Sequence, residues 1–160
     1  MPIKDIYQNM PLGKLCAMVT KPYFGALVNK LEYLGVEKNF SVLILIEEKP
    51  SCTQRFISDA LQIDKVSMVK IIDDFAKKQL VKRIQNPKDR REYFIELTEK
   101  GKKMLPKIHK GIEELNAITF KGLSQKERDT FYKTLVKVSD NVKDFPSSHV
   151  IVYKTKKIKK

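Results

Sequence analysis

The sequence predicts a mainly α-helical fold that carries one small β-ribbon, and residues 64–97 supply the clearest evidence. The stretch DKVSMVKIIDDFAKKQL repeats apolar residues at helical spacing. Two alternating, strand-like segments follow, LVKRIQ and EYFIEL, separated by the polar tip NPKDRR. A helix that leads into a basic-tipped, two-stranded ribbon is the layout of a winged helix-turn-helix. In that module the helix enters a DNA major groove and the ribbon contacts the neighbouring backbone.

Length and charge point the same way. A chain of 160 residues suits a single domain with a sizeable core, or a small domain with appended helices. Its 32 Lys and Arg against 19 Asp and Glu give a net charge of +13, which favours a polyanionic partner such as nucleic acid or an anionic membrane surface. Five of these charges are lysines of residues 154–160, and without them the remaining chain still carries +8.

Other features of the sequence exclude several classes of protein. No apolar run approaches the roughly 20 residues of a membrane-spanning helix, and the start, MPIKDIYQNM, lacks a signal-peptide pattern. Cys16 and Cys52 are too few for a disulfide framework in a chain of this length. We therefore expect a cytoplasmic protein with reduced thiols and with no cofactor or metal.

Two helices are expected before the helix-turn-helix. The first runs from about Leu12 to Leu34, with Pro22 expected to kink or interrupt it and Gly35 to end it. A short, very apolar helix covers residues 39–47, and Pro50 prevents its continuation. Residues 51–53 are expected to form a connector.

Capping residues define the next two helices. Thr53 is a suitable N-cap for a helix over residues 54–61, and Asp64 for the helix that follows the tight turn at residues 61–63. The second of these helices has two distinct faces. Its apolar face consists of Met68, Ile71, Ile72 and Phe75, and its opposite face of Val66, Lys70, Asp73 and Lys77.

Two more helices are expected after the ribbon. Thr98 can cap a long helix that runs toward Phe120, and the apolar stripe of this helix is interrupted only by Pro106. Ser124 and Glu127 then form a capping box for the last helix. The apolar stripe of that helix is Phe131, Leu135, Val138 and Val142. The long first and last helices cannot bury their stripes against so small a centre, which leaves either a symmetric dimer or a monomeric bundle.

The stretch from DKVSMVKIIDDFAKKQL to LTEKGKKML resembles the multiple-antibiotic-resistance-regulator (MarR) family of bacterial transcription factors. Within it, NPKDRR followed by IELTEKG is similar to the family's wing, and GLSQKERDTFYKTL to its penultimate segment. The similarity covers residues 35–142. It implies an obligate dimer with winged helix-turn-helix lobes, usually a repressor that is released from a palindromic operator by a small ligand or by oxidation.

This resemblance divides the chain into four parts. Residues 1–34 are expected to be the N-terminal dimerisation helix, residues 35–97 the DNA-binding lobe, residues 98–145 the C-terminal dimerisation helices and residues 146–160 a basic, disordered tail. Family members commonly carry Gly at the position of Gln79. If that position requires a positive φ, glutamine costs about 1–2 kcal/mol; otherwise the turn is built differently.

Arg91 is the strongest single candidate for DNA contact. It matches the family's Asp-x-Arg, which begins at Asp89 and in which the arginine enters the minor groove while the aspartate orients it. A permanently charged guanidinium suits the negative potential of a narrow minor groove. The alternative is an ordinary salt bridge within the turn. Lys88 and Arg90 flank the tip and are expected to meet phosphates.

The helix that begins after Asp64 is the expected recognition helix, which would enter the major groove. Its exposed N-terminal half supplies the other candidates for DNA contact. Lys65, Val66, Ser67, Val69 and Lys70 come within reach of base edges, and the two valines can touch thymine methyl groups. Each of these side chains can equally be a solvated surface residue. At the start of the supporting helix, the candidate phosphate anchors are Thr53, Gln54 and Arg55. Lys82 and Arg83, at the start of the ribbon, could equally form a solvated edge.

The family resemblance says least about the signal that the protein detects, because the first helix matches the family only loosely. One branch of the family senses organic hydroperoxides through a first-helix cysteine, which makes Cys16 a candidate redox sensor; such a cysteine is otherwise core. A pocket for a small aromatic or hydrophobic effector is the other expectation. Its candidate lining residues are Tyr7, Tyr23, Phe24, Tyr33 and His109, each of which can equally be a core or surface residue.

Three other classes of function were weighed against a DNA-binding regulator. Nothing supports an enzyme, since the chain has no glycine-rich phosphate loop and no HExxH, and only two histidines. A winged-helix module that binds other proteins instead of DNA would not need lysine and arginine concentrated at the wing tip. A basic protein that binds DNA non-specifically would depend mainly on the tail.

Overall fold

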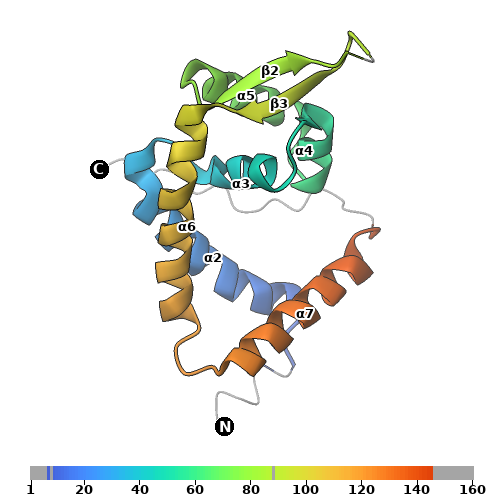
Figure 1. The fold of residues 1–160 in the computed structure, drawn as a ribbon. Helices are drawn as coiled ribbons and strands as arrows, with labels where there is room; N and C mark the ends of the chain where they lie inside the picture. The colour runs from blue at the N-terminus through green and yellow to red at the C-terminus, as the bar shows by residue number, and fades with distance from the viewer. Residues whose placement is uncertain (1–6, 8, 88, 146–160) are drawn as a thin grey trace, which may run out of the picture. The chain divides into compact units, whose positions relative to one another are not determined.

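The computed structural model describes residue 7 and residues 9–87 and 89–145, which form two compact units that divide between residues 119 and 120. The expected fold, mainly helical with a small sheet, is confirmed (Figure 1). Within the described residues, no helix is both long enough and apolar enough to cross a bilayer.

The first long helix, α2, runs from Leu12 to Leu31 and continues directly through Pro22. Of the two effects expected of Pro22, interruption of the helix was therefore wrong, and a kink stays a prediction. The proline removes one backbone hydrogen bond, but the residues after it pack tightly, since Leu27 and Leu31 are buried in the core. A 3₁₀ turn, η1 (Glu32–Leu34), follows, and Gly35 ends it at φ 64°, as the sequence predicts.

The next helices form the centre of the first unit. A second 3₁₀ turn, η2 (Glu37–Asn39), leads into α3 (Phe40–Glu48), in which four side chains are buried. Helix α4 (Gln54–Ala60) begins at Thr53, whose hydroxyl accepts a hydrogen bond from the Phe56 N–H at 3.1 Å. Helix α5 (Lys65–Lys77) begins at Asp64, whose carboxylate accepts one from the Ser67 N–H at 2.9 Å. Both predicted caps are confirmed.

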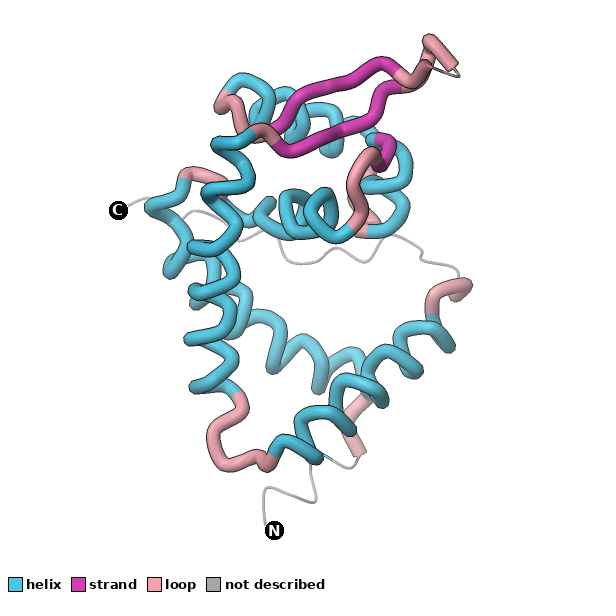
Figure 2. The backbone as a smooth tube through the Cα atoms, viewed as in Figure 1, coloured by secondary structure: helices cyan, strands magenta, loops and turns pink. Residues whose placement is uncertain are grey.

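The sheet has three strands in the order β1-β3-β2, not the two expected. β2 (Val81–Gln85) and β3 (Tyr93–Leu97) form the predicted antiparallel ribbon, which extends past the neighbouring helices in Figure 2. β1 is only Cys52–Thr53, and it pairs with Ile95 and Phe94 of β3. The prediction of a connector at residues 51–53 was thus wrong, because two residues are too short to show alternation and their partners in β3 are more than 40 residues further along the chain.

Helix α6 (Glu99–Thr119) leaves the sheet and completes the core of the first unit. The Thr98 hydroxyl accepts a hydrogen bond from the Gly101 N–H at 3.1 Å, which confirms the predicted cap. The same hydroxyl donates to the Gln79 carbonyl at 2.5 Å, so the start of α6 is attached to the end of α5. The largest fully buried side chains of this core include Phe75, Leu31, Leu43, Ile46, Ile57, Met68, Ile72, Ile95, Leu105 and Ile108.

Gln79 ends α5 in the left-handed conformation, with φ 58°. The Leu80 N–H donates to the Phe75 carbonyl at 2.8 Å and the Gln79 N–H to the Ala76 carbonyl at 2.9 Å, which is the hydrogen-bond pattern of a Schellman motif. The position therefore requires a positive φ, and glutamine occupies it at a cost in strain.

Gln79→Gly is accordingly expected to raise the free energy of unfolding by about 1 kcal/mol, because glycine has no Cβ to strain at positive φ. The nearby helical change Lys77→Gly should lower it by about 0.5–1 kcal/mol. Urea unfolding of both variants beside the wild type checks the opposite signs. A loss of stability in Gln79→Gly would contradict the strain argument.

The second unit contains α7 (Gln125–Val142), which begins with the predicted capping box. The Ser124 N–H donates to the Glu127 carboxylate at 2.7 Å, and the Glu127 N–H to the Ser124 hydroxyl at 3.4 Å. Phe120 packs edge-on against the rings of Phe131 and Tyr132. No residue of α7 is buried, so the other described residues of this unit leave its apolar stripe largely uncovered.

Candidate nucleic-acid interface

Helix α5 presents two chemically different faces, as the sequence predicts. Met68, Ile72 and Phe75 are fully buried and fix the helix on the core. On the outward side Val66 is 66% exposed and Val69 is 42% exposed. The exposed lysines of this helix are Lys65, Lys70 and Lys77. Packing therefore holds one face and leaves the other, basic and apolar, free for a partner.

Asp64 and Ser67 form the N-terminal cap of this helix. Hydrogen bonds from the Ser67 side chain and then from its backbone N–H hold the pKa of the Asp64 carboxyl below its ordinary value. Ser67 is half-buried and turned partly to this cap, so its hydroxyl is less available for a base than the sequence alone indicates.

The lowered pKa of Asp64 gives a testable pH dependence. The folded-state pKa lies below the unfolded one, so this contribution to stability is present above the unfolded pKa and is lost as pH falls through the folded pKa. Asp64→Asn keeps a good N-cap but removes the charge. We expect the wild type to be more stable than the variant at pH 7 and the difference to shrink steadily below about pH 4. Urea unfolding from pH 7 to pH 2 measures it; a difference independent of pH would contradict the assignment.

The residues at the start of α4 lie next to the recognition helix, but only one is a free cation. The Thr53 hydroxyl is engaged as the cap, and Gln54 is half-buried. The Arg55 side chain is 82% exposed and forms only a loose pair with Asp59, at 3.8 Å. Arg55 is therefore the strongest candidate phosphate anchor of the three.

Backbone hydrogen bonds organise the wing tip. The Asn86 N–H donates to the Glu92 carbonyl at 2.9 Å, and the Glu92 N–H to the Asp89 carbonyl at 3.0 Å. The Asp89 carboxylate accepts a hydrogen bond from the Arg91 backbone N–H at 2.9 Å. Asp89 thus positions Arg91 through the main chain, and no ion pair joins their side chains in the described part of the wing.

The two arginines of the tip are exposed, and among the described residues neither has an acidic partner. The Arg90 carbonyl is held by the Gln85 side-chain amide at 3.0 Å. Lys88, the third cation expected here, lies outside the described residues. The tip therefore presents two uncompensated guanidinium groups on a hydrogen-bonded loop.

The cations at the base of the wing are neutralised instead. Arg83 pairs with Asp73 of α5 at 2.6 Å, and Lys82 pairs with Glu96, directly opposite on β3, at 3.2 Å. The Arg83–Asp73 pair connects the wing to the recognition helix and fixes their relative placement. Sequence reasoning missed this contact, because nothing in the spacing of the two residues indicates it.

The residues expected to line an effector pocket are not gathered in one cavity. The Tyr23 hydroxyl donates to the Asn116 side chain at 2.7 Å, Phe24 packs on Phe40 with ring centroids 5.7 Å apart, and Tyr33 is 71% exposed. Tyr7 is 40% exposed. Tyr33 lines a hollow of about 410 Å³ between α2 and α6.

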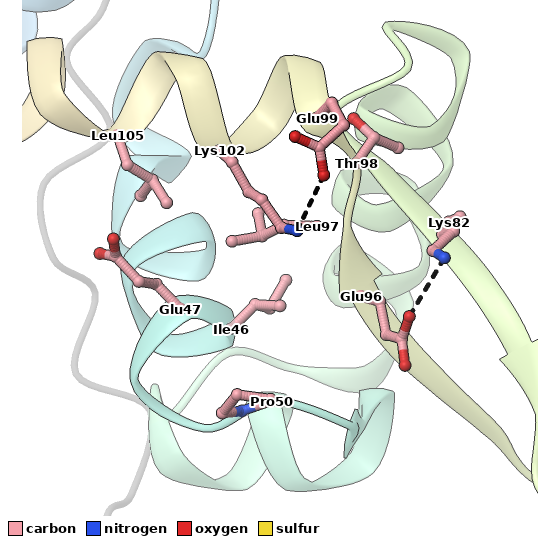
Figure 3. A pocket seen from close by; sticks show the side chains of 10 residues that line it. All are labelled: Ile46, Glu47, Pro50, Lys82, Glu96, Leu97, Thr98, Glu99, Lys102 and Leu105. Carbon is pink, nitrogen blue, oxygen red and sulfur yellow. Dashed lines mark hydrogen bonds and ion pairs between the residues drawn. The ribbon is translucent and has the colours of Figure 1, made fainter.

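A larger hollow, of about 830 Å³, opens between α3, the wing and α6 (Figure 3). Its charged groups are mostly paired, with Lys102 bonded to Glu99 at 2.8 Å and Lys82 to Glu96. Glu47, which lines the hollow, bonds at 2.6 Å to His109, one of the residues expected to line an effector pocket. The lining consists of Ile46, Glu47, Pro50, Lys82, Glu96, Leu97, Thr98, Glu99, Lys102 and Leu105.

The cysteines differ in environment. Cys16 is half-buried on α2, whereas Cys52 is only 4% exposed and burial raises the pKa of its thiol. Cys52 is therefore a structural side chain, while the redox role of Cys16 stays a prediction. No cluster of three or more potential metal ligands occurs among the described residues.

Comparison with known proteins supplies the decisive observation. The model of the MarR family matches residues 37–93, from η2 to the first residue of β3. The chain is 29% identical to the HTH-type transcriptional regulator BilQ of Clostridioides difficile over 146 residues, which is 91% of this chain and 88% of the relative. The chain is similar to the MarR family.

Solved structures of MarR-family proteins have the same fold. A cysteine-to-serine mutant of E. coli MarR, crystallised with operator DNA, is 27% identical and superposes with a TM-score of 0.72 over 82% of this chain and 95% of that one. A MarR-family regulator from Listeria monocytogenes in complex with a 26mer DNA superposes with a TM-score of 0.79 at 24% identity, over 84% and 91% of the two chains. This protein is therefore a transcriptional regulator and not an enzyme.

Proposed function

We propose that this MarR-family regulator is a homodimeric repressor that acts in the cytoplasm and binds a palindromic DNA operator. Residues 35–97 would be the DNA-binding lobe, and residues 1–34 and 98–145 the dimerisation helices. The basic segment 146–160, expected to be a disordered tail, lies outside the described residues. The solved complex of E. coli MarR with operator DNA supports this proposal.

The observation that carries the proposal is the pair of free basic elements on one lobe. Helix α5 exposes Lys65 and Lys70 in its N-terminal half, and the wing tip exposes Arg90 and Arg91 without acidic partners in the described residues. A helix in the major groove and an arginine in the adjacent minor groove require this arrangement. Lys88, Asp89 and the three residues at the start of α4 complete the proposed contact surface.

Uncovered apolar surface on the long helices supports a dimer. Leu12, Met18 and Val19 of α2 are 54%, 43% and 56% exposed, and Ile118 of α6 is 71% exposed. The stripe of α7 is similarly uncovered. A second copy that covers these helices would place two recognition helices one DNA turn apart, about 34 Å, which is why we expect a palindromic operator.

Competitive DNA binding at near-physiological salt tests the proposal. The protein's own upstream intergenic DNA is set against scrambled DNA, and we expect a preference of about 10³-fold. Affinity should fall steeply as salt rises, because phosphate contacts release counterions. Equal binding to both sequences would favour a non-specific DNA-binding protein, and no salt-dependent binding would favour an adaptor for proteins.

Neighbouring arginines of the wing provide matched variants for this assay. Arg91→Ala is expected to lower the affinity for the specific sequence about tenfold and to reduce the preference over scrambled DNA, because it removes a minor-groove contact. Arg90→Ala should weaken binding to both sequences alike, as expected for a phosphate contact. If the two variants behaved identically, the assignment of Arg91 to the minor groove would be wrong.

Release by a small hydrophobic effector is the form of regulation that we propose, with the 830 Å³ hollow as its site. Its size is that of a ligand pocket, and it lies where the DNA-binding lobe meets α6. Both lysines of its lining are already paired, Lys82 with Glu96 and Lys102 with Glu99, so aromatic acids would find no free cation there and are expected to leave operator affinity unchanged. Oxidation of Cys16 is the competing signal. If Cys16 is the sensor, the Cys16→Ser variant should lose peroxide-triggered release from DNA.

A further inference from the structure

Two valines of the recognition helix are exposed, and packing among the described residues of the lobe does not account for apolar side chains at these positions. Val66 and Val69 are 66% and 42% exposed, whereas Met68, Ile72 and Phe75 on the same helix are fully buried. The valines are three residues apart and so share one face of α5. Lysines flank both valines, at positions 65 and 70. A partner for this face must therefore be polyanionic and must also offer apolar groups.

The DNA major groove offers one apolar group at base edges, the C5 methyl of thymine. The other side chains of this part of α5 offer few contacts with adenine–thymine pairs. Lys65 and Lys70 can donate to guanine O6 and N7 or to phosphates, but no Asn or Gln that could bond to adenine lies between Lys65 and Lys70. Ser67 also bonds to Asp64, and Asp73, one turn further along, is engaged by Arg83.

We propose that Val66 and Val69 recognise thymine methyl groups, so that each operator half-site carries two thymines under the N-terminal half of α5. Side chains at i and i+3 are about 5–6 Å apart at Cβ, and successive bases of one strand rise by about 3.4 Å. The two methyl groups therefore lie one or two base steps apart. This inference rests on the proposed DNA-binding function and specifies the class of sequence that the helix recognises.

Base analogues test the role of the methyl group directly. The probe is a duplex that the full-length protein selects from a randomised library. Replacing a contacted thymine with deoxyuridine removes only the methyl, and we expect affinity to fall roughly fourfold for each methyl. Changing that T·A pair to C·G should weaken binding, and 5-methylcytosine at the same place should recover about the same fourfold, because it restores the methyl in the groove.

Valine variants assign each methyl to a side chain. In Val66→Ala and Val69→Ala the deoxyuridine substitution at the corresponding thymine should no longer reduce affinity. The matched control is Val136→Ala, because Val136 is 62% exposed but lies on α7. In this variant the deoxyuridine substitution should lower the affinity as much as it does in the wild type. Both valines are exposed on a helix, so alanine leaves folding intact.

The outcomes separate this inference from the proposed function. A selected sequence that tolerates deoxyuridine everywhere beneath α5, or variants that retain the penalty, would overturn the valine–thymine assignment and leave specific DNA binding in place. Failure to select any sequence would overturn both. Loss of the penalty at one defined thymine in each variant supports both.

Discussion

Gly101→Ala is expected to lower the free energy of unfolding by about 3 kcal/mol, because the added methyl has no space. A Cβ at this buried position would lie 2.1 Å from the Leu80 carbonyl oxygen and 3.2 Å from a methyl of Leu97. The Leu80 oxygen cannot move aside easily, since it accepts the Thr98 N–H at 3.0 Å. The start of α6 would have to shift away from the end of α5.

Gly25 supplies the matched control for this change. It also lies within a helix, but a Cβ there would meet nothing within 4 Å. Gly25→Ala should therefore raise stability by about 0.5–1 kcal/mol, since alanine favours the helix. Urea unfolding of both variants measures the opposite signs. If Gly101→Ala were as stable as the wild type, the contact between α6 and the Leu80 carbonyl would not be tight.

Local patterns predicted the elements that position the candidate interface. The apolar spacing of α5, its Asp64 cap and the alternation of β2 and β3 all depend on residues close in sequence. Caps at Thr53, Thr98 and Ser124 were predictable for the same reason. These signals are strong because helix ends and amphipathic faces follow from the chemistry of a few neighbouring residues.

Contacts between distant segments could not be predicted in this way. Pairing of β1 with β3, the Arg83–Asp73 ion pair and the close approach of Gly101 to Leu80 each depend on the folded arrangement. Asp89 shows that sequence reasoning is limited even within a single turn. Sequence identified Asp89 and Arg91 together, but the carboxylate engages the arginine's backbone N–H. The lining of an effector pocket stays a prediction, because the types of the candidate residues carried no information about the distances between them.

Leu135→Glu is expected to weaken the proposed dimer by at least 10²-fold in its dissociation constant. Leu135 lies in the middle of the α7 stripe and is 43% exposed, beside Phe131 at 44% and Val142 at 42%. A second copy that covers the stripe would bury a carboxylate without a partner, and in a symmetric interface it would do so twice. The cost of burying an unpaired charge is several kcal/mol, which exceeds the gain from the remaining apolar contacts.

Val136→Glu distinguishes loss of the interface from the effect of added charge. Val136 is 62% exposed and lies well away from the stripe on the helix circumference, so the same substitution there should leave the dimer intact. Sedimentation equilibrium of both variants gives the oligomeric state, and circular dichroism checks that α7 remains helical. In the DNA assay, Leu135→Glu should lose affinity for a full palindrome while keeping the wild-type affinity for a single half-site, because the lobe itself is unchanged. A dimeric Leu135→Glu would mean that α7 does not form the interface, and the palindromic operator would lose its structural basis.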